Sequence, residues 1–107
     1  MPRQTFYYPI HNSDPKMSKR PWVIGYVEVE SEKWSANYLC LPLGPPILYT
    51  TKEEVMQCLD KITYGTVIRE VFEVNGPPSV QDRIDFVQAS LRKKQDLGLS
   101  RSNRKKP

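Results

Sequence analysis

Residues 47–74 read ILYTTKEEVMQCLDKITYGTVIREVFEV and predict a strand, a helix and a second strand in succession. Thr51 is a good helix N-cap, and Glu54 three residues later completes a capping box, in which each side chain binds the other residue's backbone amide. The helix that begins there presents an apolar stripe at helical spacing, made by Val55, Leu59 and Ile62. This unit has the clearest local signals in the chain, and the rest of the fold is predicted around it.

The end of this helix and its flanking strands have signals of their own. Gly65 predicts a left-handed C-cap, so that the helix ends near Tyr64. Residues 66–74 are rich in β-branched and aromatic side chains and predict one strand. Residues 47–50 predict a short strand that leads into the helix.

A β-hairpin is predicted before this unit. Residues 22–30, WVIGYVEVE, predict a strand whose two faces are both apolar at its start. Residues 31–35 form a polar connection, and residues 36–43 predict a second strand. The leucines of this second strand face one way: Leu39, Leu41 and Leu43. Trp34 then lies at the hairpin tip, where it either folds back on the sheet or projects to a partner.

The N-terminal segment allows two interpretations. Residues 5–10, TFYYPI, predict an edge strand that Pro9 closes, or an arm that orders only on binding a partner. Residues 11–21 contain almost no apolar side chain and predict a loop.

A second helix is predicted near the C-terminus. It follows the turn signal NGPP at residues 75–78, with Ser79 as N-cap and Asp82 at the third position. Its apolar stripe consists of Val80, Ile84, Val87 and Leu91. Gly98 predicts the end of this helix. Beyond Leu99, residues 100–107 contain no apolar side chain, so we expect a disordered basic tail over residues 99–107.

This order of elements predicts an α+β domain with a mostly antiparallel sheet of four or five strands and two helices packed on one face. The predicted organisation is an N-terminal arm and loop over residues 1–21, a single domain over residues 22–98, and the basic tail over residues 99–107. Two cysteines, no signal peptide and no long uncharged apolar run favour a soluble protein of a reducing, cytoplasmic compartment, with no membrane segment.

The formal charge of +4 is unevenly distributed along the chain. Residues 1–20 sum to +3, residues 21–91 to −5 and residues 92–107 to +6, so that an acidic body has two basic ends. A uniformly basic nucleic-acid-binding surface is therefore not predicted.

Residues able to support catalysis are few. His11, the single histidine, is expected in a polar loop without the fixed surroundings that a general base needs. Cys40 and Cys58 occupy positions typical of core residues and lack an activating neighbour in sequence. No metal-ligand spacing and no phosphate-binding glycine motif is present in the sequence. We therefore predict no enzyme activity and no cofactor.

Two binding functions remain as hypotheses. The first is an adaptor or inhibitor that binds a protein, for example within a complex that handles nucleic acid, and a small accessory protein encoded by a virus or phage fits this profile. Its predicted partner-binding residues are Tyr7, Tyr8, Trp22, Trp34 and Tyr38, because aromatic anchors dominate many interfaces. The alternative is direct nucleic-acid binding by the basic ends. Its predicted residues are Lys19, Arg20, Arg92, Lys93, Lys94, Arg101, Arg104, Lys105 and Lys106. The sequence makes no prediction of the oligomeric state.

Overall fold

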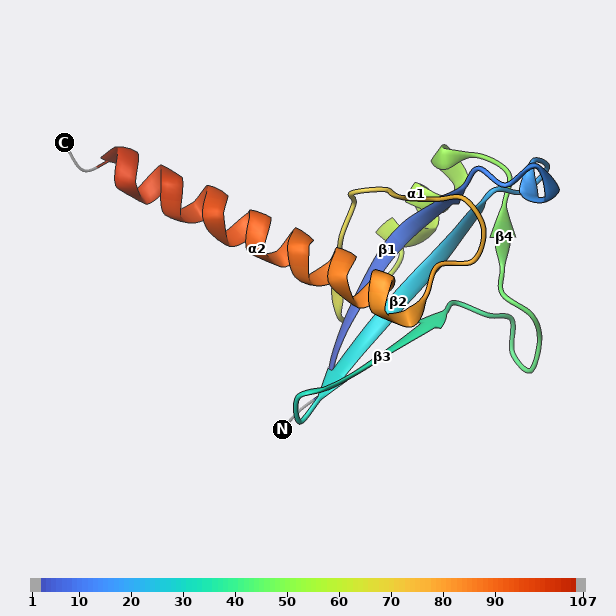
Figure 1. Cartoon of the computed structure of the whole chain (residues 1–107), viewed down its shortest axis with the longest axis horizontal. Helices are drawn as coiled ribbons and strands as arrows, with labels where there is room; N and C mark the ends of the chain where they lie inside the picture. The colour runs from blue at the N-terminus through green and yellow to red at the C-terminus, as the bar shows by residue number, and fades with distance from the viewer. Residues whose placement is uncertain (1–2, 106–107) are drawn as a thin grey trace.

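A computed structural model describes the backbone of residues 3–105 and the side chains of residues 3–93. The chain folds as an α+β protein with a six-stranded mixed sheet (Figure 1). The elements in chain order are β1 (Gln4–Asn12), the 3₁₀ turn η1 (Pro15–Met17), β2 (Trp22–Glu30), β3 (Lys33–Tyr38), β4 (Leu48–Tyr49), α1 (Lys52–Asp60), β5 (Thr66–Val67), β6 (Phe72–Val74) and α2 (Val80–Lys105). The predicted class is confirmed, although the sheet has more strands than the four or five expected.

The centre of the sheet is β1, not an edge. It pairs antiparallel with β2 along its whole length from Gln4 to His11, and on its other side it pairs in parallel with β5 and then β6. Strands β3 and β4 pair antiparallel with β2 and complete the sheet. The predicted edge strand at residues 5–10 is therefore wrong in position, and the arm predicted over residues 1–21 contains the strand that joins the two halves of the sheet.

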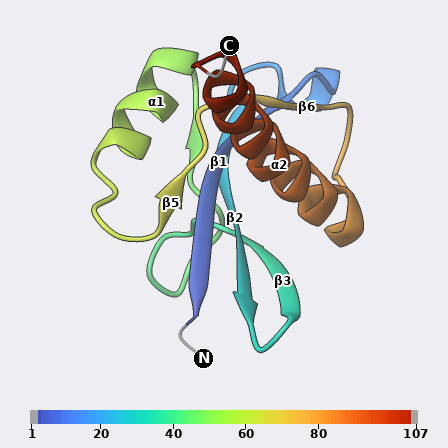
Figure 2. The same ribbon diagram turned by 90° about the vertical axis from the view of Figure 1, so that its left-hand side faces the viewer.

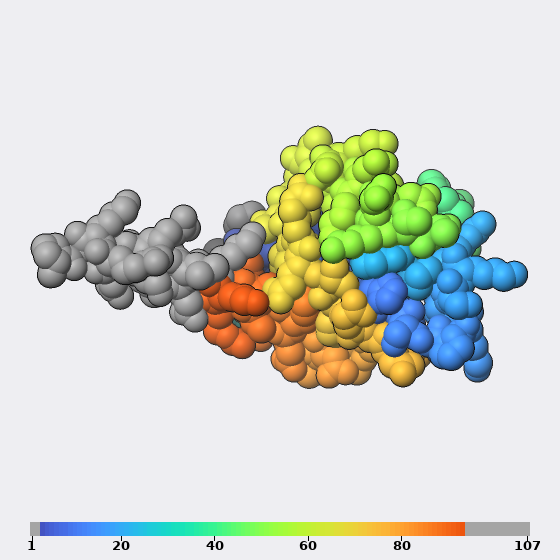
Figure 3. All heavy atoms as spheres, turned by 90° about the horizontal axis from the view of Figure 1, so that it is seen from above, coloured from blue at the N-terminus to red at the C-terminus, as the bar shows by residue number. Residues whose placement is uncertain are grey.

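The two helices cover opposite faces of the sheet, which corrects the prediction that both pack on one face. Side chains of β1 alternate between the faces: Tyr8 joins the core beneath α2, with Ile84 and Val87, whereas Tyr7 joins the core beneath α1, with Val55 and Leu59. Figures 2 and 3 show α1 and α2 on the two sides of the sheet. The run of apolar residues in β1 and at the start of β2 explains this arrangement, because a strand buried on both faces needs a cover on each.

The start of α1 follows the prediction. The Thr51 hydroxyl accepts a hydrogen bond from the Glu54 amide at 3.2 Å, and a Glu54 carboxylate oxygen accepts one from the Thr51 amide at 3.1 Å. The helix ends at Asp60, one turn before the predicted end near Tyr64. Gly65 does have a positive φ of +80°, but it acts in the connection to β5, where a Cβ would lie 2.8 Å from the carbonyl oxygen of Thr5.

We expect Thr51→Ala to lower the free energy of unfolding by about 1 kcal/mol, because it removes one half of the capping box. Urea denaturation checks this value. Thr63→Ala is the matched control, since Thr63 is exposed and lies outside the helices and strands, and we expect it to change stability by less than about 0.5 kcal/mol. Equal denaturation midpoints for wild type and Thr51→Ala would contradict the role of the cap.

The strand predicted over residues 66–74 forms as two short pieces. β5 pairs with Phe6 and Tyr7, and β6 pairs with β1 from Ile10 onward. The amide of Ile68 still donates to the Tyr7 carbonyl at 2.7 Å and its side chain is buried in the core beneath α2, after which the chain leaves the ladder.

The second helix begins as predicted and continues beyond the predicted end. The Ser79 hydroxyl accepts from the Asp82 amide at 3.0 Å, which caps α2. The helix passes Gly98 and reaches Lys105. The side chains after Lys93 lie outside the described part of the chain, and so do the predictions made for Lys94, Arg101, Arg104, Lys105 and Lys106.

Candidate functional site

Three of the five aromatic residues predicted to bind a partner are core residues. Tyr7, Tyr8 and Trp22 are buried, with Tyr8 at 0% exposure. The prediction placed them at the surface because their strands were expected at the edge or at the start of the domain. In the centre of a sheet covered on both faces, their rings are removed from solvent.

Trp34 lies in β3 and not at the hairpin tip. The turn consists of Ser31 and Glu32 alone, with φ of 50° and 67°, which is the left-handed pair typical of a two-residue hairpin. Trp34 follows in the ladder opposite Val29, and its ring stacks on Phe6 with 6.2 Å between ring centroids. It is half-buried and supports the core beneath α2.

A buried arginine on α2 was not predicted. Arg83 is 3% exposed, and its Nε donates to the Tyr8 hydroxyl at 2.7 Å, while Nη2 donates to the carbonyl of Asn37. Its guanidinium carbon lies 4.1 Å from the ring centroid of Tyr38 and 5.8 Å from that of Tyr8. The helical pattern placed Arg83 off the apolar stripe, and only the burial of Tyr8 and Tyr38 beside it reveals its role.

Gly25 makes room for this cluster. A Cβ at residue 25 would lie 2.8 Å from Nη2 of Arg83, 2.7 Å from Ile10 Cδ1 and 3.0 Å from the Tyr8 ring. Burial raises the pKa of Tyr8 above its ordinary value, although the Arg83 guanidinium opposes the shift. Among the side chains described, no carboxylate lies within 4.0 Å of Arg83, so aromatic rings and neutral oxygen acceptors stabilise its charge. We assign this cluster to the architecture of the domain.

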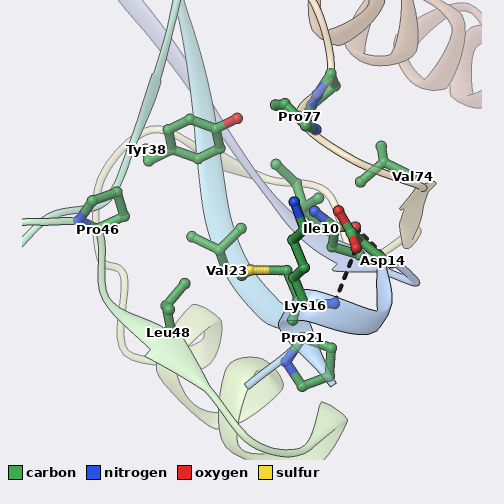
Figure 4. Close-up of a pocket in the computed structure, with 13 residues that line it drawn as sticks. Ile10, Asp14, Lys16, Pro21, Val23, Tyr38, Pro46, Leu48, Val74 and Pro77 are labelled. Atoms are coloured by element: carbon green, nitrogen blue, oxygen red, sulfur yellow. Dashed lines mark hydrogen bonds between the residues drawn. The ribbon is translucent and has the colours of Figure 1, made fainter. Parts of the chain in front are cut away.

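An open apolar pocket lies at the end of the sheet where β1 ends and β2 begins. Its volume is about 290 Å³. Ile10 of β1 and Val23 of β2 form its floor, and three connections form its walls: the η1 loop, the β3–β4 loop and the turn between β6 and α2 (Figure 4). Most of the wall residues are apolar: Met17, Pro21, Tyr38, Pro46, Leu48, Val74, Pro77 and Pro78. Tyr38 is thus the one predicted partner-binding residue that contributes to this site.

The β3–β4 loop, which contributes Pro46 to the pocket wall, also contains exposed leucines. The second strand predicted over residues 36–43 ends at Tyr38, and the chain beyond it turns outward. Leu43 is fully exposed and has a left-handed φ of 55°, while Leu41 and Leu48 are 49% and 38% exposed. The prediction that Leu39, Leu41 and Leu43 face one way in a strand is therefore wrong, because the strand ends before them. The run of leucine and proline without any charge was the signal in the sequence for this surface.

The predicted basic residues lie at two separate ends of the molecule. Lys19 and Arg20 are exposed in the loop that contains η1, whereas Arg92 and Lys93 are exposed on the far part of α2. Figure 3 shows the η1 loop (blue) at one end of the molecule and the described part of α2 (orange) away from it. Within residues 3–93, the two groups do not form one continuous basic surface.

His11 lies at the end of β1 and not in a loop. Its Nδ1 is 2.8 Å from a carboxylate oxygen of Glu73, its neighbour on β6, and its ring centroid is 4.6 Å from that of Trp22. Within the described chain, no group of three or more histidine, cysteine or acidic side chains is arranged to hold a metal ion.

The two cysteines occupy different environments. Cys40 is exposed on the β3–β4 loop, where its thiol donates to the Tyr38 carbonyl at 3.2 Å, and Cys58 is half-buried on α1. Burial, together with a hydrogen bond to Cys58, raises the pKa of Tyr49 above its ordinary value. The prediction that both are core positions thus holds in part for Cys58 and is wrong for Cys40.

Neither helix, over its described residues, is long and apolar enough to cross a membrane. Comparisons of the chain with protein-family models, with curated protein sequences and with solved structures give no significant match.

Proposed function

We propose that this chain is a non-enzymatic protein-binding module, an adaptor or inhibitor, whose docking site is the apolar pocket at the end of the sheet together with the exposed leucines beside it. The observation that carries this proposal is an open apolar pocket whose wall includes the partly exposed Leu48, with the fully exposed Leu43 on the loop that contributes Pro46 to the same wall. An exposed apolar surface of this kind is costly in water unless a partner covers it.

The construction of the site favours tight binding of a protein segment. Four prolines contribute to the walls, namely Pro21, Pro46, Pro77 and Pro78. Their fixed φ angles reduce the conformational freedom that the walls would lose on binding, and a preorganised site binds with a smaller entropic cost. The floor belongs to the two longest strands, so the pocket is held by the most rigid part of the fold.

The pocket is less suited to nucleic acid. Binding of single strands uses aromatic rings as stacking platforms along a basic groove. Tyr38 is the single aromatic residue in the lining, and its ring already packs against Arg83. Within the described chain, the predicted basic residues of the η1 loop and those of α2 form two separate groups. This separation also favours the protein-binding hypothesis over the nucleic-acid alternative.

A peptide selection tests the proposed site. A phage library of random peptides about twelve residues long, enough for one extended docking segment, is selected on the purified full chain. We expect enrichment of peptides with large apolar residues, and we expect Leu48→Asp and Met17→Asp each to weaken their binding by at least about tenfold, because both place a charge in the pocket wall.

Tyr64→Asp is the matched control. Tyr64 is a large side chain with 73% exposure, and it lies beside Thr5 and Gly65, at the other end of β1 from the pocket. We expect this variant to bind the selected peptides like wild type. Circular dichroism and urea denaturation establish that each variant is folded. Peptides that bind the folded Leu48→Asp and Met17→Asp variants as well as wild type would refute the pocket as the docking site.

A further inference from the structure

We infer that the segment bound in the apolar pocket has an apolar anchor with acidic residues toward the η1 loop and basic residues toward the start of α2. This inference rests on the proposed function and specifies the chemistry of the partner. Three features of the described chain support it: the size of the pocket, the charge of the η1 loop and the charge of a second hollow beyond the wall at residues 75–78.

The pocket suits a side-chain anchor. Its volume of about 290 Å³ lies just below the range of about 300–1,000 Å³ that is typical of pockets for drug-sized ligands. It therefore accommodates one large or two small apolar side chains, with the remainder of the segment lying across the rim. The charged groups around the rim then determine which residues of the partner segment are favoured on either side of its anchor, because opposite charges attract.

The rim on the η1 side is basic. Lys16 and Asp14 both line the pocket, and Lys19 and Arg20 are exposed in the same loop without lining it. Asp14 is the one acidic residue of this loop, and its carboxylate accepts from the Lys16 amide at 3.0 Å as the cap of η1 (Figure 4). The loop has three basic residues and one acidic residue, so acidic residues of a partner are favoured on this side.

The side toward α2 is acidic. A second hollow of about 520 Å³ shares Val74, Pro77 and Pro78 with the first and is lined by three carboxylates, those of Glu73, Asp82 and Asp85. Among the described residues that line it, none is basic. Basic residues of a partner are therefore favoured beyond the proline wall.

The carboxylates of this hollow differ in their existing partners. A carboxylate oxygen of Glu73 lies 2.8 Å from His11 Nδ1. A carboxylate oxygen of Asp85 accepts a hydrogen bond from the side-chain amide of Gln81 at 2.8 Å. The Asp82 side chain has no hydrogen-bond partner among the side chains described.

The β3–β4 loop adds no charge to either side. Residues 38–51 contain no charged side chain, and the turn at residues 75–78 contains none either. The basic and acidic sides are thus separated by uncharged walls. The two hollows share Val74, Pro77 and Pro78, so an extended segment anchored in the first continues past this wall to the second.

The test uses the same random phage library on the full chain, followed by affinity measurements on synthetic copies of the selected peptides at low and high salt. We expect selected peptides to combine a large apolar residue with acidic residues on one side of it and basic residues on the other. The triple variant Lys16→Glu, Lys19→Glu, Arg20→Glu is expected to bind them at least about tenfold more weakly at low salt, and the effect is expected to shrink at high salt.

A second variant and a matched control complete the test. Asp82→Asn with Asp85→Asn is expected to weaken binding of the same peptides by about threefold to tenfold at low salt. The control is Lys33→Glu, Lys52→Glu, Lys61→Glu, which changes the net charge by the same amount at exposed positions outside both hollows. We expect the control to bind within about twofold of wild type, since distant charges are screened.

Failure of this inference differs from failure of the proposed function. Peptides without the two-sided charge pattern, or a triple variant that binds like its control, would overturn the inference, while sensitivity to Leu48→Asp would leave the docking site standing. No enriched peptide, or peptides indifferent to Leu48→Asp and Met17→Asp, would overturn both.

Discussion

Replacement of Arg83 by alanine is expected to lower the free energy of unfolding by about 3 kcal/mol, although arginine is a residue that sequence patterns place at the surface. The guanidinium donates to the Tyr8 hydroxyl at 2.7 Å and to the Asn37 carbonyl, and it lies over the Tyr38 ring. Alanine leaves the hydroxyl of Tyr8 buried without this donor and opens a cavity between the two rings.

Urea denaturation with an unchanged slope measures this loss. Arg92→Ala is the matched control, because Arg92 is exposed on the same helix, and we expect it to change stability by less than about 0.5 kcal/mol. Arg83→Lys keeps the charge but loses the planar guanidinium that lies over Tyr38, so an intermediate loss is expected. Equal stabilities of Arg83→Ala and Arg92→Ala would show that the buried cluster does not stabilise the fold.

Leu59→Ala is expected to lower the free energy of unfolding by about 2–5 kcal/mol. Leu59 is completely buried on α1, where it packs with Tyr7 and Ile24 on the face of the sheet opposite α2. Removal of its side chain leaves a cavity that two strands and one short helix cannot easily fill.

Leu43→Ala is the matched control for this prediction and also separates stability from binding. Leu43 is fully exposed, so its truncation is expected to change the unfolding free energy by less than about 0.5 kcal/mol. The same variant is expected to weaken the binding of selected peptides, because Leu43 is exposed on the loop that contributes Pro46 to the pocket wall. A large stability loss from Leu43→Ala, or none from Leu59→Ala, would contradict the assignment of the two leucines to surface and core.

The arrangement of the fold explains why a docking site forms where it does. α2 crosses the sheet and extends away from it (Figure 1), while Ile10 and Val23, which belong to the core beneath α2, also form the floor of the pocket. Three connections rich in proline surround the pocket without closing over it. The pocket between these connections is thus the part of the described chain that we propose receives a partner.

The sequence by itself determined the features whose signals lie within a few residues. The capping box of Thr51 and Glu54 and the cap of Ser79 set the starts of both helices, and the alternation in residues 22–30 set β2 at its observed bounds. The class of the fold followed from the order of these elements. Such signals depend on local hydrogen bonds and on side-chain periodicity, so they can be found without knowledge of what packs against them.

Only the tertiary structure decided which surfaces are buried. The segment at residues 4–12 became the central strand because β2 on one side and β5 and β6 on the other pair with it. That pairing buried Tyr7 and Tyr8 and placed the helices on opposite faces, so most of the aromatic residues predicted to bind a partner became core while Tyr38 lines the pocket. Arg83 meets Tyr8 across 75 residues of sequence, and the candidate pocket is assembled from three separate connections. Contacts between residues so distant in the chain depend on strand pairing and helix packing, which no local pattern specifies.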